Sequence, residues 1–189
     1  MVPSNGQNRE CASPDSTAGR GNDSSPALEI RSPTAYDGAA IWKLVAQDPV
    51  LDTNSCYAYL LLCRHHAETC VTAMQKDRLA GFVTAYFPPA QPDTIFVWQI
   101  AVADFMRKQG LGRRMLRHLL QMPACAKAKY LEATVSPSNL ASMRLFQSLA
   151  EELGVPFQAD QGFHREHFRE LDHEDEPLIR IGPLEDGCT

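Results

Sequence analysis

The period of the hydrophobic pattern changes along the chain and predicts strands alternating with helices. Short apolar runs bounded by proline, glycine or charged turns are typical of strands, and apolar residues recurring every three or four positions are typical of helices. A run of hairpins followed by strand–helix–strand units favours one domain of the α/β (α+β) class built on a single sheet. Strands are expected at about 27–31, 69–75, 79–87, 94–102, 129–135, 156–160 and 177–182. Helices are expected at about 35–47, 55–66, 110–121 and from Asn139 to Gly154.

The expected helix at 55–66 and the expected strand at 94–102 differ in how they distribute their apolar residues. In the helix, Tyr59 and Cys63 belong to one core-facing stripe, whereas Tyr57 falls on a different face and is free to line a pocket. The strand is almost continuously apolar, so we expect a central strand that is covered on both faces.

Composition divides the chain into a folded domain and two tails. Residues 1–26 are rich in Ser, Gly, Asn, Pro and Asp, and they cannot bury enough apolar surface to offset the entropy lost on ordering. We therefore expect a disordered N-terminal tail at 1–26, one domain at 27–184 and a short C-terminal tail at 185–189.

Charge and cysteine usage narrow the class of protein. The net charge of -5 disfavours a nucleic-acid partner, which requires a clustered basic surface. No apolar run approaches the roughly 20 residues that span a bilayer. The N-terminus lacks a secretory pattern and the cysteines are scattered. We expect a cytoplasmic protein with no membrane partner and with reduced, structural cysteines.

The most informative motif is Arg107-Lys108-Gln109-Gly110-Leu111-Gly112, which lies between the apolar strand and an amphipathic helix. A pyrophosphate at this place would meet free backbone N–H groups and the positive end of the helix dipole. The glycines lack a Cβ and therefore allow the backbone to approach the phosphates closely. The spacing fits neither a dinucleotide-binding fingerprint nor a P-loop.

This motif resembles the acetyl-CoA motif [RQ]-x-x-G-x-[GA] of the GNAT superfamily. The resemblance implies the acyl-CoA N-acyltransferase fold, a mixed and mostly antiparallel sheet flanked by helices, and acetyl-CoA as the co-substrate. It also implies that the backbone at Ile100 and Val102 and the side chain of Asn139 hold the cofactor arm. Many members carry a tyrosine proton donor seven residues after that asparagine, but this chain has Phe146 there.

A closer resemblance covers residues 28–183. The segments Leu51-Asp52-Thr53-Asn54-Ser55-Cys56-Tyr57, Phe96-Val97-Trp98-Gln99 and Leu131-Glu132-Ala133-Thr134-Val135, with the ending from His164 to Pro183, are similar to the L-2,4-diaminobutyrate acetyltransferases of ectoine biosynthesis. This resemblance implies acetyl transfer to the γ-amine of a small diamino acid, a role in osmotic stress and a homodimer.

The acceptor carries two amines and a carboxylate, so its pocket needs carboxylates or aromatic faces for the amines. Positions in the matching motifs make Asp52, Tyr57, Trp98, His173 and Glu176 the substrate-binding candidates. A primary amine must lose a proton before it attacks. Glu176 or His173, directly or through water, is the candidate base, and Tyr57 is a third catalytic candidate.

Several alternatives remain open from the sequence. Asp52 can equally be a helix N-cap residue, Trp98 a core residue and Glu132 either a support for the site or a member of an ion pair. His164 and His167 lack a recognised zinc spacing, so no metal is expected. The alternative functions are a GNAT enzyme for another amine and a non-catalytic CoA-binding regulatory module, for which Phe146 is the only support.

Overall fold

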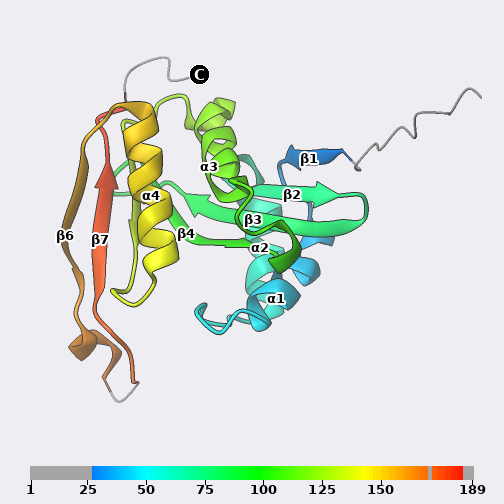
Figure 1. The fold of residues 1–189 in the computed structure, drawn as a ribbon, viewed down its shortest axis with the longest axis horizontal. Coiled ribbons are helices and arrows are strands. Elements are labelled where there is room, and N and C mark those ends of the chain that lie inside the picture. The colour runs from blue at the N-terminus through cyan, green and yellow to red at the C-terminus, as the bar shows by residue number, and fades with distance from the viewer. Residues whose placement is uncertain (1–26, 170–171, 185–189) are drawn as a thin grey trace, which may run out of the picture.

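The computed structural model describes residues 27–169 and 172–184. The expected tails at 1–26 and 185–189 lie outside the described residues. Within the described part of the chain, one seven-stranded sheet has the strand order β1-β2-β3-β4-β5-β7-β6 (Figure 1). The strands are β1 (Leu28–Arg31), β2 (Val71–Gln75), β3 (Arg78–Tyr86), β4 (Thr94–Val102), β5 (Tyr130–Thr134), β6 (Phe157–Phe163) and β7 (Glu176–Ile181).

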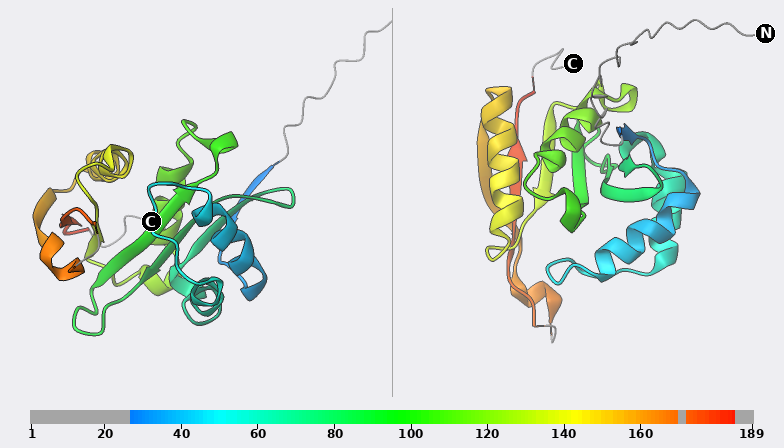
Figure 2. Two further views of the ribbon diagram at one scale, coloured as in Figure 1. Left: turned by 90° about the horizontal axis from the view of Figure 1, so that it is seen from below. Right: turned by 45° about the vertical axis from the view of Figure 1, so that its right-hand side comes forward.

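Helices cover both faces of this sheet (Figures 1 and 2). α3 and α4 pack on one face around a large apolar core, and α1 and α2 pack on the other around a smaller one. The helices are α1 (Gly38–Ala46), α2 (Cys56–His65), α3 (Leu111–Gln121) and α4 (Leu140–Leu153). Each expected strand and helix is present, and the α/β class with a single mixed sheet is confirmed.

The centre of the sheet opens along β4. β4 pairs antiparallel with β3, but it pairs in parallel with β5 only over Thr94 to Phe96, although β4 itself continues to Val102. Past Phe96 the two strands therefore separate. The N–H and C=O groups along this edge of β4 are available to a ligand, because strand edges present unpaired backbone groups.

A β-bulge lies in β4 at Trp98. Thr84 pairs with Gln99 and Ala85 pairs with Val97, so Trp98 is the extra residue of the strand. The bulge changes the face to which side chains point: Val97 belongs to the core under α3 and α4, whereas Ala101 belongs to the core under α1 and α2.

The expectation that β4 is covered on both faces is wrong in its second half. Ile95 and Val97 are buried, but Trp98 is 36% exposed, and Ile100 and Val102 are half-buried. The bulge and the separation from β5 leave these side chains at an opening in the sheet. The continuous apolar run of β4 therefore reflects a buried first half and a second half that borders a cleft.

Among the described residues, Cys56, Cys63, Cys70 and Cys125 are free thiols, and the last three are buried. Burial raises the pKa of Cys63 to about 12, of Cys70 to about 11 and of Cys125 to about 12, so none of these thiols forms a reactive thiolate near neutral pH. In the described ranges, no helix combines the length and the apolar character that a bilayer span requires.

Candidate active site

The loop before α3 has the backbone geometry of an anion cradle. Gly110 is the residue before α3 and has φ 71°, and Lys108, two residues earlier, has φ 61°. Left-handed residues turn successive N–H groups toward the same side, and a positive φ in a lysine costs roughly 1–3 kcal/mol, which points to a functional constraint. The first turn of α3 adds its own free N–H groups and the positive end of its dipole.

A cleft of about 420 Å³ lies where β4 separates from β5. Five of the predicted cofactor residues line it: Ile100, Val102, Arg107, Lys108 and Asn139. The opposite wall comes from α4 and from the loop between α1 and α2. The cleft joins the free edge of β4 to the anion cradle, so it fits an extended molecule with a phosphate group at one end.

Four predicted cofactor residues do not line the cleft: Gly110, which precedes α3, and Gln109, Leu111 and Gly112. Leu111 is buried in the core, and Gln109 donates its side-chain N–H to the Phe105 carbonyl. Gly112 is buried, and a Cβ placed there would lie 3.1 Å from Leu145 Cδ2 and 3.8 Å from Val102 Cγ2. Since Leu145 and Val102 both line the cleft, a larger residue at 112 would fill it.

Asn139 has a structural task that the sequence reasoning did not assign. It is the N-cap of α4, and its Oδ1 accepts a hydrogen bond of 3.0 Å from the Ser142 N–H. Asn139 also lines the cleft, so the same residue starts α4 and borders the predicted cofactor site.

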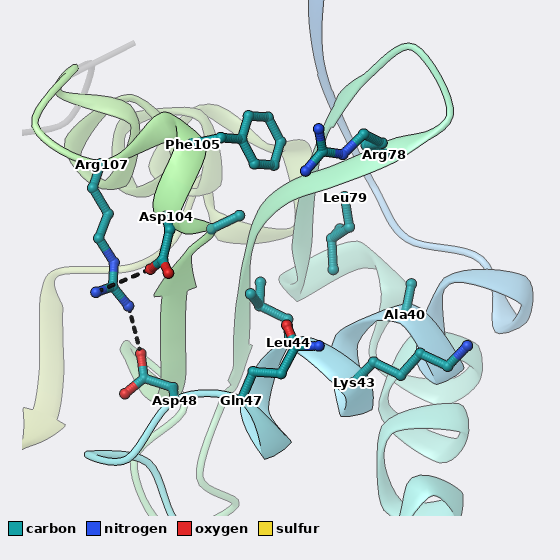
Figure 3. A pocket seen from close by; sticks show the side chains of 11 residues that line it. Ala40, Lys43, Leu44, Gln47, Asp48, Arg78, Leu79, Asp104, Phe105 and Arg107 are labelled. Atoms are coloured by element: carbon teal, nitrogen blue, oxygen red, sulfur yellow. Dashed lines mark hydrogen bonds and ion pairs between the residues drawn. The ribbon is translucent and has the colours of Figure 1, made fainter.

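The Arg107 side chain is held by two carboxylates. Its guanidinium lies 3.0 Å from Asp48 and 3.1 Å from Asp104 (Figure 3). Its Nε–H donates to the Val102 carbonyl. Asp48 and Arg107 line both this cleft and a neighbouring pocket between α1 and β3. Asp48 was not among the predicted site residues, because it is distant from the glycine motif in the chain.

Replacing Asp48 by asparagine is expected to tighten CoA binding about two- to fivefold, because it removes a partly exposed negative charge beside a phosphate site. Asparagine keeps the Oδ1 that accepts the Val50 N–H, so the loop should hold. Calorimetric titration with CoA at low and high salt measures the change, which salt should diminish. Weaker binding would mean instead that Asp48 holds Arg107 in its binding position.

Three predicted substrate-binding residues lie together: the carboxylates of Asp52 and Glu176 flank the imidazole of His173. His173 Nε2 lies 3.4 Å from Asp52 Oδ2 and 4.0 Å from Glu176 Oε1. The Phe168 ring stacks on the imidazole with the centroids 3.9 Å apart. The Glu174 carboxylate accepts the Ser138 N–H and ties this segment to the start of α4. Residues 121 positions apart in the chain, Asp52 and His173, thus face each other.

The surroundings of His173 favour its cationic form. Its Nδ1–H donates to the Glu174 carbonyl, 2.8 Å away, and a carbonyl can only accept. This hydrogen bond raises the pKa of His173, and the Asp52 and Glu176 carboxylates raise it further, against a smaller opposing effect of burial. One cation between two carboxylates gives the cluster a net charge of about -1 when all three are ionised.

Neutralising Asp52 as asparagine should therefore lower the pKa of His173. The folded chain binds this proton more tightly than an unfolded chain does, so protonation of His173 stabilises the fold. The stabilisation is fully present below about pH 6.5, and it is lost as the pH rises through the raised pKa of His173. The Asp52→Asn variant should lose part of this dependence. An NMR titration of the imidazole, assigned with His173→Gln, tests it, and an unchanged pKa would refute the contact.

The aromatic candidates differ in position. Trp98 stacks on Tyr59 with centroids 6.1 Å apart, and one of its sides remains exposed. Tyr57 is 66% exposed, and it lies on the face of α2 opposite the buried Tyr59. The role of Tyr57 as a catalytic or substrate residue stays a prediction.

The N-cap residue of α2 is Ser55, whose side chain accepts the Ala58 N–H. Asp52 is therefore not the helix cap, which removes that alternative for it.

Two further alternatives from the sequence are answered by contacts. Glu132 is buried and accepts the Arg180 Nε–H at 2.6 Å, and Arg180 also lies over the Tyr130 ring, so Glu132 is a member of an ion pair. Phe146 is 1% exposed and packs in the core of the sheet. It therefore cannot take part in proton transfer. Gln99, which the sequence reasoning did not select, contacts the Asp52 loop.

The histidine-rich segment forms ring contacts. His164 and His167 stack at 5.9 Å, and His167 Nδ1 lies 2.9 Å from the His164 backbone nitrogen. Within residues 27–169 and 172–184, no group of three or more histidine, cysteine, aspartate or glutamate side chains has the arrangement of a metal site.

Residues 39–150 match the Acetyltransferase (GNAT) family. The chain is 50% identical to the L-2,4-diaminobutyric acid acetyltransferase of Bordetella parapertussis, over 82% of this chain and 84% of that protein. It is 47% identical to the enzyme of that name from Halalkalibacterium halodurans, over 83% and 82% of the two chains.

Among solved structures, the chain is similar to the diaminobutyrate acetyltransferase EctA from Paenibacillus lautus in complex with its substrate L-2,4-diaminobutyric acid and coenzyme A. The TM-score is 0.82 and the identity 42%, over 85% of this chain and 97% of that chain. The cleft at the glycine motif and the match over most of the domain lead to one conclusion: the chain belongs to the GNAT acetyltransferase family and, within it, to the L-2,4-diaminobutyric acid acetyltransferases.

Proposed function

We propose that this chain transfers the acetyl group of acetyl-CoA to the γ-amino group of L-2,4-diaminobutyrate. The observation that carries the proposal is the position of the Asp52–His173–Glu176 cluster beside the cleft at the glycine motif. Leu51 lines the cleft and the next residue, Asp52, faces His173. An amine held by this cluster and a thioester held along β4 are therefore neighbours.

The charge of the cluster matches this acceptor. Diaminobutyrate carries two ammonium groups and one carboxylate near neutral pH, and hence a net charge of about +1. The cluster carries the opposite charge, with Asp52 open to solvent and Glu176 half-buried. Trp98 adds an exposed aromatic face, to which an ammonium group is attracted.

The chain's residues have three tasks in the transfer. The free backbone N–H groups of β4 beyond Trp98 orient the thioester and stabilise charge on its oxygen. Glu176 or neutral His173 accepts the proton that the γ-ammonium must lose before its nitrogen attacks the thioester carbon. The carbon–sulfur bond then breaks and the thiolate leaves without a proton donor at position 146, which is reasonable for a thiol of pKa about 8.5.

We infer further that the chain acts in the cytoplasm, in ectoine formation under osmotic stress. The name of its relatives, L-2,4-diaminobutyric acid acetyltransferase, supports this proposal, since diaminobutyrate acetylation is the step that the resemblance implies for that pathway. The γ-acetylated product then needs a ring closure by another enzyme, because acetyl transfer alone forms no ring.

We also propose a homodimer that covers the outer face of α2. Apolar side chains gather there around a hollow of about 440 Å³, whose lining includes Ala58, Leu61, Leu62 and Tyr86. Exposed apolar groups in contact with one another are typical of interfaces. Light scattering should give about twice the monomer mass, and Leu61→Glu should halve it. A wild-type monomer at micromolar concentration would refute the proposal.

Thiol release from acetyl-CoA tests the proposed substrate. Among diaminobutyrate, ornithine, lysine and putrescine, diaminobutyrate should give the highest kcat/KM, by about tenfold or more. Ornithine and lysine have additional methylene groups and putrescine lacks the carboxylate, and each difference weakens the fit. Turnover with a different amine alone would keep the family and discard the acceptor pocket. Binding of acetyl-CoA without turnover of any amine would leave the regulatory module.

A further inference from the structure

Gln99 is a buried polar residue in an otherwise apolar strand, and it lies in the bulge of β4. It is 8% exposed. Its side-chain Nε2–H donates to the Asp52 carbonyl at 2.9 Å, and its Oε1 accepts the Tyr59 hydroxyl at 2.8 Å. A carbonyl can only accept, so the amide nitrogen must face Asp52 and the amide oxygen must face Tyr59. One side chain thus joins β4, α2 and the loop before α2.

The bulge itself is fixed from the other side. The Thr84 hydroxyl of β3 donates to the Gln99 backbone carbonyl at 3.3 Å, and Thr84 is 1% exposed. Tyr59, which is fully buried, packs its ring against both Phe82 and Trp98. Gln99 therefore links a buried part of the sheet to the loop that carries Asp52, whose own side chain is 81% exposed.

We propose that Gln99 is the positioning residue of the acceptor pocket: its amide holds the Asp52 main chain so that the Asp52 carboxylate faces His173, and through Tyr59 it holds the Trp98 ring. The two groups that it links are both predicted to contact the amine substrate, and Ile100, the next residue, lines the cofactor cleft. One buried amide thereby sets the position of the amine pocket relative to the thioester. The kinetic part of this inference rests on the proposed function.

Gln99→Met tests the link, because methionine keeps the volume and removes both hydrogen bonds. We expect the KM for diaminobutyrate to rise about tenfold, as for a lost buried hydrogen bond, while the Kd for CoA stays within about twofold. Tyr59→Phe removes the hydroxyl and keeps the buried ring, so it should produce a smaller rise. Gln147→Met, the same change on the exposed face of α4, should leave both constants unchanged.

A second readout does not depend on the substrate. If Gln99 holds Asp52 against His173, the His173 pKa measured by NMR falls in Gln99→Met toward its value in Asp52→Asn, and Gln147→Met leaves it unchanged. A wild-type His173 pKa in a folded Gln99→Met protein would overturn the proposal, whatever the substrate. A lowered pKa without turnover of diaminobutyrate would uphold the positioning role and refute the proposed function instead. If Gln99→Met does not fold, Tyr59→Phe decides by the same two measurements, and wild-type values there would overturn the proposal.

Discussion

Replacing Glu176 by glutamine is expected to lower kcat/KM for diaminobutyrate by a factor of about 100 to 10,000, the range over which general bases contribute. Glu176 is half-buried at the start of β7 and lies 4.0 Å from His173 Nε2. The hydrogen bond to the Glu174 carbonyl and the neighbouring carboxylates raise the pKa of His173 and so favour the cationic imidazole, and a cation cannot accept the proton of the γ-ammonium. The half-buried carboxylate is then the better acceptor, directly or through water.

The pH dependence of kcat/KM shows whether Glu176→Gln loses a catalytic base or instead distorts the site. As pH rises toward the amine pKa of about 10, the substrate loses its own proton, and the deficit of Glu176→Gln should shrink. Asp172→Asn removes the same charge from an exposed position of the segment and should stay within about twofold of the wild type. A Glu176→Gln enzyme within threefold of wild type across the whole pH range would leave neutral His173 as the base.

Enlarging Gly112 to valine is expected to weaken CoA binding by about 100-fold, equivalent to about 2.8 kcal/mol. A Cβ at this position already lies 3.1 Å from Leu145 and 3.8 Å from Val102, which both line the cleft. Two further methyl groups have no room beside them, so they must push α3 from α4 or occupy the cleft. Overpacking of this kind also costs roughly 1–3 kcal/mol of stability. Calorimetry with CoA measures the affinity, and thermal unfolding measures the stability.

Gly38→Ala is a control that introduces steric strain at a site away from the cleft. Its Cβ would lie 2.9 Å from Leu60 Cδ2 between α1 and α2, on the opposite face of the sheet. This variant should lower the Tm but bind CoA like the wild type. Unchanged CoA affinity in a folded Gly112→Val protein would show that the cofactor does not use this cleft.

The sequence predicted the fold well because its signals were local. The stripe with Tyr59 and Cys63, the glycines before α3 and Gly154 at the end of α4 each specify an element through nearby residues. The expected strand at 156–160 ends too early: β6 continues to Phe163, which pairs with Glu176 after an irregularity. Such a continuation depends on a partner strand and not on the strand's own pattern.

The candidate site was predictable only in part, because its contacts are long-range. Family motifs pointed to Asp52, Trp98, His173 and Glu176, but only the fold brings Asp52 to His173. No local pattern indicates that Asp48 holds Arg107 across 59 residues. Gln99 did carry a signal, since a lone glutamine in an apolar strand needs a buried partner. The identity of that partner depends on the bulge, which the residue pattern cannot locate.

The position of the acetyl group on the product tests the central claim most directly. The protein is supplied with acetyl-CoA labelled with ¹³C in the acetyl group and with diaminobutyrate, and two-dimensional NMR correlates the new amide with its neighbouring carbon. The account predicts that the labelled carbonyl couples to the γ-methylene protons, because the pocket presents the γ-nitrogen to the thioester. Coupling to the α-proton, or free acetate with no amide, would contradict it.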